Sequence, residues 1–88
     1  MNTKQFCVYI MTSGYRGTLY VGVTSNLPGR VYQHREGLAD GFTNDHGINT
    51  LVWFEPHETA ESAIRREKRL KRYKRDWKIQ MTEDTNPH

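Results

Sequence analysis

The sequence of 88 residues predicts an α+β fold in which helices flank a three-stranded antiparallel sheet. Two strand-like runs, residues 6–12 (FCVYIMT) and 18–23 (TLYVGV), are separated by a short glycine-bounded turn. So short a connection predicts an antiparallel hairpin. A third strand-like run and three helical segments follow. A chain of this length has room for one domain, so we expect residues 1–88 to form a single domain.

Hydrophobic spacing places the next two elements. Residues 27–38 are predicted to form the first helix, because apolar positions and one histidine recur at helical spacing. These positions are Leu27, Val31, His34 and Leu38. Residues 39–49 are rich in Gly, Asp and Asn and are expected to form a loop. Residues 50–55 (TLVWFE) predict the third strand, which Pro56 is expected to end.

Two further helices are predicted in the C-terminal part of the chain. The second helix is expected from Ala60 to Tyr73, with Thr59 as its N-cap. Its apolar positions are Ala60, Ala63, Ile64, Leu70 and Tyr73. A short third helix is expected from Asp76 to Met81. The residues of this helix expected to contact the core are Trp77 and either Ile79 or Gln80.

Positive charge is concentrated in residues 65–78. This segment holds nine of the thirteen basic residues and two acidic ones, so its net charge is +7. Because the net charge of the whole chain is +3, the remaining residues together carry −4. The basic residues are Arg65, Arg66, Lys68, Arg69, Lys71, Arg72, Lys74, Arg75 and Lys78. Such asymmetry favours a polyanionic partner. The alternative is a solvated helix surface, because Lys and Arg are good helix formers.

Several classes of protein do not fit this composition. The lone cysteine, Cys7, cannot form an intramolecular disulfide and fits a reducing cytoplasm. No signal peptide is recognisable, and no run approaches the roughly 20 apolar residues of a membrane span. We therefore expect a cytoplasmic protein without a membrane partner. Cys7 and the four histidines lack the paired spacing of structural zinc ligands. His57 and His88 are expected to be ordinary surface residues.

Glu67 is out of place in the second predicted helix. It lies four residues after Ala63 and three before Leu70, within the apolar stripe. Buried carboxylates are usually ion-paired or bound to a metal. The structural alternative to a metal ligand is an ion pair with Arg30 or with Lys71, four residues further along the helix.

Four other polar or aromatic residues are candidates for phosphate chemistry. Arg30 and His34 are four residues apart and share one face of the first helix, where they could grip a phosphate together. Tyr9 and Tyr20 fall on the two arms of the hairpin. Strand tyrosines ordinarily pack in the core, but a phenol near a metal and several cations can become a general base.

These residues together resemble the GIY-YIG nuclease superfamily, in particular its small single-domain bacterial members. The first motif is Cys7-Val8-Tyr9, which keeps the tyrosine and replaces Gly-Ile, and the second is Tyr20-Val21-Gly22. Arg30 and His34 match the arginine and histidine of the family's helix, and Glu67 matches its metal-ligand glutamate. Further similar segments are Gly41-Phe42-Thr43, Trp77-Lys78 and Asn86-Pro87.

The resemblance implies the GIY-YIG endonuclease fold and hydrolysis of a DNA phosphodiester with one divalent metal, Mg²⁺ or Mn²⁺, held by Glu67. A single carboxylate suits Mg²⁺ because this ion keeps water ligands. Arg30 would neutralise charge that develops on the phosphate. Tyr9 or Tyr20 would accept the proton of the attacking water, helped by the other tyrosine or by His34. The sequence leaves open which tyrosine does so.

The resemblance also implies a surface that binds the substrate. Gly22 would let the backbone approach the phosphate, and Asn86 would support the site. The basic helices would hold duplex or branched DNA through its backbone, with Arg66, Lys68, Lys71, Lys74 and Lys78 as the contacts. No segment of this sequence resembles a recognition module, so we expect structure-directed or weakly sequence-specific cleavage, or recruitment by a partner protein, in DNA repair or recombination. The alternatives are a nucleic-acid-binding module without nuclease activity and a protein-interaction module for an acidic partner.

Overall fold

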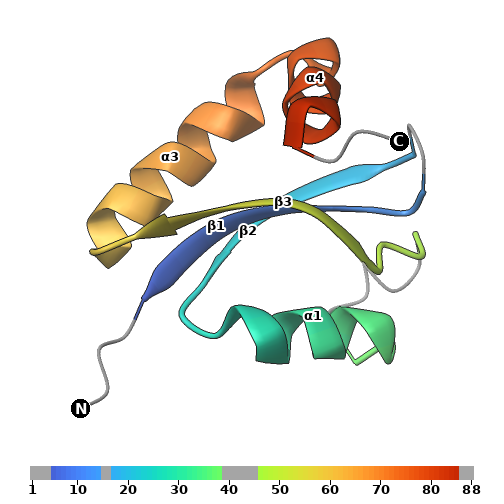
Figure 1. Ribbon diagram of the computed structural model, residues 1–88, viewed down its shortest axis with the longest axis horizontal. Helices are drawn as coiled ribbons and strands as arrows, with labels where there is room; N and C mark the ends of the chain where they lie inside the picture. Colours follow the sequence, from blue (N-terminus) through green and yellow to red (C-terminus); the bar gives the residue numbers. More distant parts are fainter. Residues whose placement is uncertain (1–4, 15–16, 39–45, 86–88) are drawn as a thin grey trace.

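The computed structural model describes residues 5–14, 17–38 and 46–85. In these residues a three-stranded antiparallel sheet, in the order β2-β1-β3, lies between two helical layers (Figure 1). Helix α1 covers one face, and helices α3 and α4 cover the other (Figure 1). The elements are β1 (Phe6–Thr12), β2 (Leu19–Thr24), α1 (Leu27–Arg35), β3 (Thr50–His57), α3 (Ala60–Arg72) and α4 (Arg75–Thr85). The predicted fold class is therefore confirmed.

Strand β1 is the centre of the molecule, because it pairs with β2 on one side and β3 on the other. Alternate side chains of a strand point to opposite faces of the sheet. Val8 and Ile10 accordingly pack with Ala63 of α3, whereas Tyr9 and Met11 join a second cluster on the opposite face. These four neighbouring side chains of β1 are all fully buried. A continuous apolar run is what a strand with two covered faces requires.

The predicted starts of α1 and α3 are correct and α4 starts one residue earlier than predicted, but helix α1 ends three residues earlier than expected. The Thr59 hydroxyl accepts a hydrogen bond from the Ser62 N–H and caps α3. Helix α1 stops because Gly37 adopts a φ of 71°. The N–H of Gly37 donates to the His34 carbonyl and the N–H of Leu38 to the Gln33 carbonyl. This pair of bonds is a Schellman motif, which closes the helix.

Strand β3 continues through Pro56 to His57, so the prediction that Pro56 ends the strand was wrong. Pro56 lies opposite Cys7 in the register of β1 and β3. Proline lacks an N–H donor, but β3 is an edge strand whose outer side pairs with no other strand of the described residues. The missing donor therefore leaves the sheet intact at that position.

Three residues expected in the core are exposed. Leu38 is 66% exposed because it lies beyond the end of α1, and Ile64 is 44% exposed because α3 faces the sheet through Ala63 and Leu70. Helix α4 is longer than predicted and buries Ile79, whereas Trp77 is 59% exposed. Helical spacing shows which residues share one face of a helix, but it does not determine which residues of that apolar face contact the sheet.

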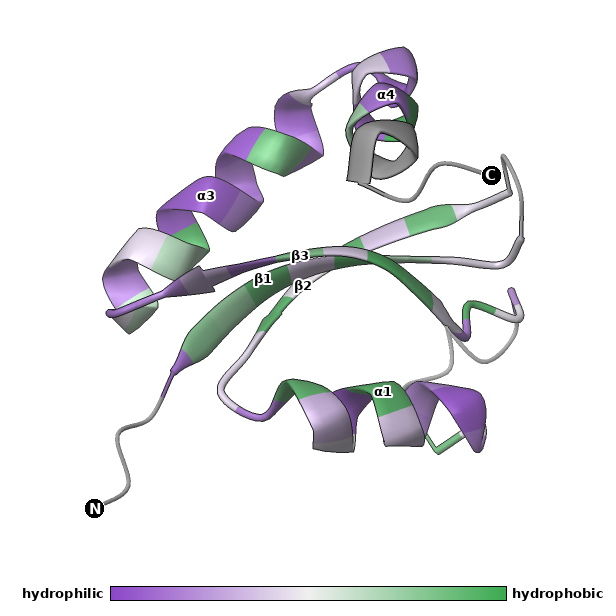
Figure 2. Ribbon diagram, in the orientation of Figure 1, coloured by the Kyte–Doolittle hydropathy of each residue, from purple (hydrophilic) through white to green (hydrophobic). Residues whose placement is uncertain are grey.

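Hydropathy follows this layering. Strand β1 is largely hydrophobic, whereas α3 is mostly hydrophilic apart from a few positions (Figure 2). A polar helix of this kind depends on a few buried side chains for its attachment to the sheet. Within the described ranges, no helix has the length and apolar character needed to cross a membrane.

We expect Leu70→Ala to lower the free energy of unfolding by about 2–5 kcal/mol, because the side chain is fully buried and its removal leaves a cavity. Ile64→Ala on the same helix is the matched control and should cost less than about 1 kcal/mol. Urea unfolding followed by circular dichroism measures both. Equal losses of stability in the two variants would show that Leu70 does not lie on the face of α3 that packs against the sheet.

Candidate functional site

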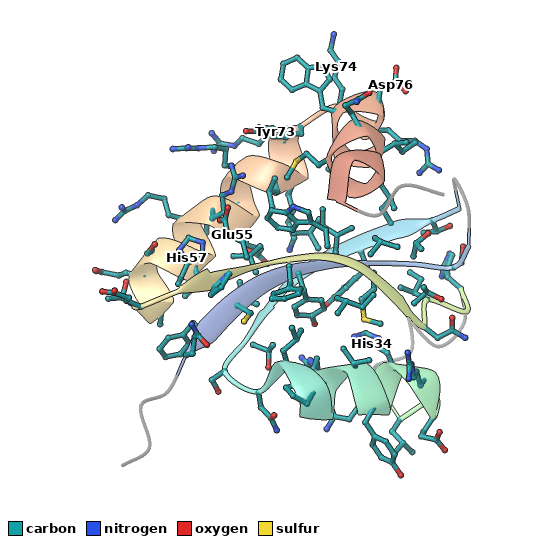
Figure 3. The ribbon with its side chains drawn as sticks, in the orientation of Figure 1. His34, Glu55, His57, Tyr73, Lys74 and Asp76 are labelled. Atoms are coloured by element: carbon teal, nitrogen blue, oxygen red, sulfur yellow. The ribbon has the colours of Figure 1, made fainter. Side chains whose placement is uncertain are left out.

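Three aromatic rings from three elements meet on the α1 side of the sheet. The ring centroids of Tyr9 in β1 and Tyr20 in β2 are 6.2 Å apart. The His34 ring of α1 lies 6.1 Å from Tyr9 and 5.7 Å from Tyr20. His34 lies between α1 and the sheet (Figure 3). The structure thus brings these three predicted residues into one cluster.

The members of this cluster differ in their access to solvent. Tyr9 is 0% exposed and His34 is 6% exposed, whereas Tyr20 is partly exposed. The Tyr9 hydroxyl, the Nε of Arg30 and both ring nitrogens of His34 are buried side-chain atoms. Arg30 also donates from Nη1 to the Gln33 side-chain oxygen at 3.1 Å. Polar atoms gathered inside so small a fold are typical of a functional site.

The surroundings of Tyr9 act on its acidity in opposite directions. Burial raises the pKa of the Tyr9 phenol above its ordinary value of 10.0, because a phenolate is poorly solvated there. The Arg30 guanidinium opposes this rise by favouring the phenolate. The neighbouring Tyr20 phenol adds to the rise in pKa. Tyr9 is consequently neutral near pH 7.

Gly22 makes room for Tyr9. The two residues face each other across the β1–β2 ladder. A Cβ atom at Gly22 would lie 2.6 Å from the Tyr9 hydroxyl oxygen and 3.0 Å from a ring carbon of Tyr20. Any side chain there would displace a tyrosine. The structure therefore gives Gly22 a packing role, whether or not a phosphate also approaches its backbone.

Glu67 lies apart from the aromatic cluster, on helix α3, which covers the opposite face of the sheet (Figure 1). Its side chain is 19% exposed and forms an ion pair with the Lys71 Nζ at 2.9 Å. Among the described residues no group of three or more His, Cys, Asp or Glu could hold a metal ion. A lone carboxylate does not suit zinc or calcium, but it fits Mg²⁺ or Mn²⁺, which accept one carboxylate with water and phosphate oxygens.

Cations gather where α3, α4 and the β1–β2 turn meet. Arg75 donates to the Gly17 carbonyl at 2.6 Å and so attaches α4 to the hairpin. Burial lowers the pKa of Lys78, and the nearby charges of Arg75 and Lys71 lower it further. Mutual repulsion of this kind is relieved when an anion binds. Lys71, Arg75 and Lys78 therefore form a cationic cluster suited to phosphate.

The other predicted contacts are distributed differently. Lys68 on α3 and Lys74 in the connection between α3 and α4 are exposed, and Asn86 lies outside the described residues, as does the segment 41–43. Arg66 is engaged within the protein: its Nε donates to the Glu55 carboxylate at 3.2 Å, and its guanidinium lies 5.9 Å from the centre of the Trp53 ring.

A polar network that the sequence did not reveal lies beside Arg66. His57, which we expected on the surface, is mostly buried and contacts Glu55 through Nε2 at 2.7 Å. Its Nδ1 shares a hydrogen bond with the Ser62 hydroxyl. Glu55 and His57 lie close together between β3 and α3 (Figure 3). Their i, i+2 spacing on a strand, which places them on one face, was the available signal.

Comparisons with known proteins agree with this architecture. A family model described as the GIY-YIG catalytic domain matches residues 5–80. A UPF0213 protein of Clostridium perfringens is 36% identical over 64 residues, which are 73% of this chain and 69% of that protein. A UPF0213 protein of Haloquadratum walsbyi is 34% identical over 67 residues, 76% of this chain and 75% of that one. The solution NMR structure of a UPF0213 protein of Bacillus halodurans matches with a TM-score of 0.57 and 27% identity, covering 94% of this chain and 88% of the other.

We expect Arg30→Gln to raise the pKa of Tyr9 further, because the guanidinium opposes the effect of burial. Arg30→Lys keeps the charge and should have a smaller effect. Titration of the Tyr9 ¹³Cζ resonance by NMR measures the shift. In the unchanged protein, stability should fall as the pH rises from about 10 toward the raised pKa, because only the unfolded chain then ionises this phenol readily. An unchanged Tyr9 titration in both variants would contradict this electrostatic account.

Gly22→Ala should destabilise the fold by about 1–3 kcal/mol, because the new methyl group overlaps the Tyr9 ring. The cost should shrink in a Tyr9→Leu background, where the ring is absent. A double-mutant cycle of urea unfolding measures this coupling. Additive effects would mean that Gly22 is required for another reason.

Proposed function

Because the chain belongs to the GIY-YIG catalytic-domain family, which is a nuclease family, we propose that it is a metal-dependent DNA endonuclease. It would hydrolyse phosphodiester bonds with structure-directed or weak sequence specificity, in DNA repair or recombination. The observation that carries this proposal is the convergence of Tyr9, Tyr20 and His34, with all three ring centroids within 6.2 Å of one another. Arg30 lies close enough to Tyr9 to alter its pKa.

The two tyrosines are suited to different roles. Tyr20 is partly exposed, so its hydroxyl can meet a water molecule that attacks a bound phosphate. Tyr9 is fully buried and neutral, which suits it to orient Tyr20 rather than to contact water. We assign the proton-accepting role to Tyr20, with His34 as the neighbour through which the proton leaves. His34 lies 5.7 Å from the Tyr20 ring, centre to centre.

Charge on the phosphate would be balanced from two elements. The Arg30 guanidinium offers planar donors that match phosphate oxygens, and its position on α1 places it beside the tyrosines. Glu67 would hold Mg²⁺ or Mn²⁺, which supplies further positive charge at the phosphate. Because Glu67 and the tyrosines belong to opposite layers, the scissile phosphate would lie near the edge strand β2, which α3 also contacts.

The cationic helices would position the rest of the DNA. The charges of Lys71 and Arg75 act on Lys78, Arg75 also bonds to the hairpin at Gly17, and exposed Lys68 and Lys74 extend this surface. Contacts to phosphates fix the orientation of a nucleic acid and do not read its sequence. This supports action on duplex or branched DNA, with any further selectivity supplied by DNA structure or by a recruiting protein.

One observation favours a second candidate, a DNA-binding module of the same fold without nuclease activity. The Glu67 carboxylate is neutralised by Lys71 within its own helix, across the sheet from the aromatic cluster. An ion pair of this kind needs no metal. In that case the cationic surface would bind DNA and no bond would be cleaved.

Replacement of the carboxylate separates the two candidates. Glu67→Gln should reduce metal-dependent nicking of plasmid DNA to the level of protein-free controls, because the ligand for the divalent ion is lost. Glu61→Gln, which changes an exposed carboxylate in the first turn of the same helix, should nick like the unchanged protein. Nicking is followed by gel electrophoresis with Mg²⁺ or Mn²⁺.

DNA affinity measured at several salt concentrations completes the experiment. Both variants should still bind DNA, with affinity falling steeply as salt is added, since phosphate contacts release counterions. Identical nicking by Glu67→Gln and the unchanged protein would rule out the catalytic assignment. Binding without any salt dependence would instead favour a protein partner over DNA.

A further inference from the structure

An exposed tryptophan marks the corner between α3 and α4. Trp77 is 59% exposed, although tryptophan carries a large apolar surface that proteins ordinarily cover. Its ring meets the Tyr73 ring edge-on, with centroids 5.5 Å apart. Tyr73 is itself anchored, since it packs against the core cluster and its hydroxyl lies 3.5 Å from an Arg66 nitrogen. The tyrosine thus supports the indole in an outward position.

Basic residues flank this indole in the sequence. Lys74 and Arg75 are exposed three and two positions before it, and Lys78 follows it with a pKa lowered by burial and by the charges of Arg75 and Lys71. Asp76 is the only acidic residue between positions 68 and 81. Lys74 and Asp76 lie at the outer end of the corner, away from the sheet (Figure 3). A flat apolar ring within a cationic surface is complementary to a base attached to phosphates.

We propose that Trp77 is a stacking site for one unstacked nucleobase, while Lys74, Arg75 and Lys78 hold the adjoining phosphates. This inference rests on the proposed function and deepens it. Bases inside a duplex are covered on both faces by their neighbours, so a ring on the protein surface meets only a base that has left the stack. Such bases occur at nicks, flaps, junctions and strand ends. Trp77 would therefore direct the protein to those structures without reading sequence.

The test compares two oligonucleotides of equal length and equal phosphate number, one with bases and one abasic, in buffer free of divalent cations. The unchanged protein should bind the base-bearing strand about five- to a hundredfold more tightly. Trp77→Ala should lose this preference and keep its affinity for the abasic strand. Trp77→Phe should retain part of the preference. Phe54→Ala, which removes another exposed aromatic ring on β3, is the matched control and should change neither affinity.

Tryptophan fluorescence gives a second readout that does not depend on how well Trp77→Ala folds. In a Trp53→Phe background Trp77 is the sole tryptophan, and the base-bearing strand should quench it more than the abasic strand does. If Trp77→Ala keeps the preference, or if both strands quench equally, the stacking site is ruled out and DNA binding stands. If neither strand binds at any salt concentration, the nucleic-acid function fails together with the stacking site.

Discussion

Strand β1 imposes the constraint on which the rest of the molecule depends. It is covered on both faces and paired on both edges, so the side chain of each of its residues can point to only one face of the sheet. A shift of one position would exchange the two sets of side chains and send Tyr9 into the α3 layer. The register that places Tyr9 opposite Gly22 is therefore also what places a phenol beside Tyr20 and His34. Core packing and site geometry are fixed by the same pairing.

Much of this architecture was predictable because its signals are local. The hairpin follows from two apolar runs joined by a short turn, and the start of α3 follows from a capping Thr59. The ion pair between Glu67 and Lys71 was one of two structural alternatives considered, and it follows from the i, i+4 spacing within one helix. The proximity of Tyr9 to His34 could not be predicted from a local signal. It came from the family resemblance, because no periodic pattern relates a strand to a helix that follows the next strand.

The errors share a physical origin: they concern how an element meets its neighbours. Pro56 ends a strand only where its N–H would be needed, and the edge position of β3 removes that need. Ile64 and Trp77 are apolar at helical spacing, yet each lies beside the line of contact with the sheet. His57 looked like a surface residue because its partner Ser62 belongs to the following helix. Tertiary packing decides such cases, and a local pattern does not contain it.

The hydrogen bond from Arg75 to the Gly17 carbonyl joins residues 58 positions apart. The cationic cluster of Lys71, Arg75 and Lys78 is therefore complete only after helix α4 has docked on the β1–β2 hairpin, which is formed by the start of the chain. During synthesis the first strands would emerge well before the surface proposed to bind DNA. A ligand held at this cluster would in turn stabilise the docked helix and, through it, the hairpin. Binding and the last stage of folding are then coupled, so a polyanion present during refolding should favour the native chain over partly assembled forms.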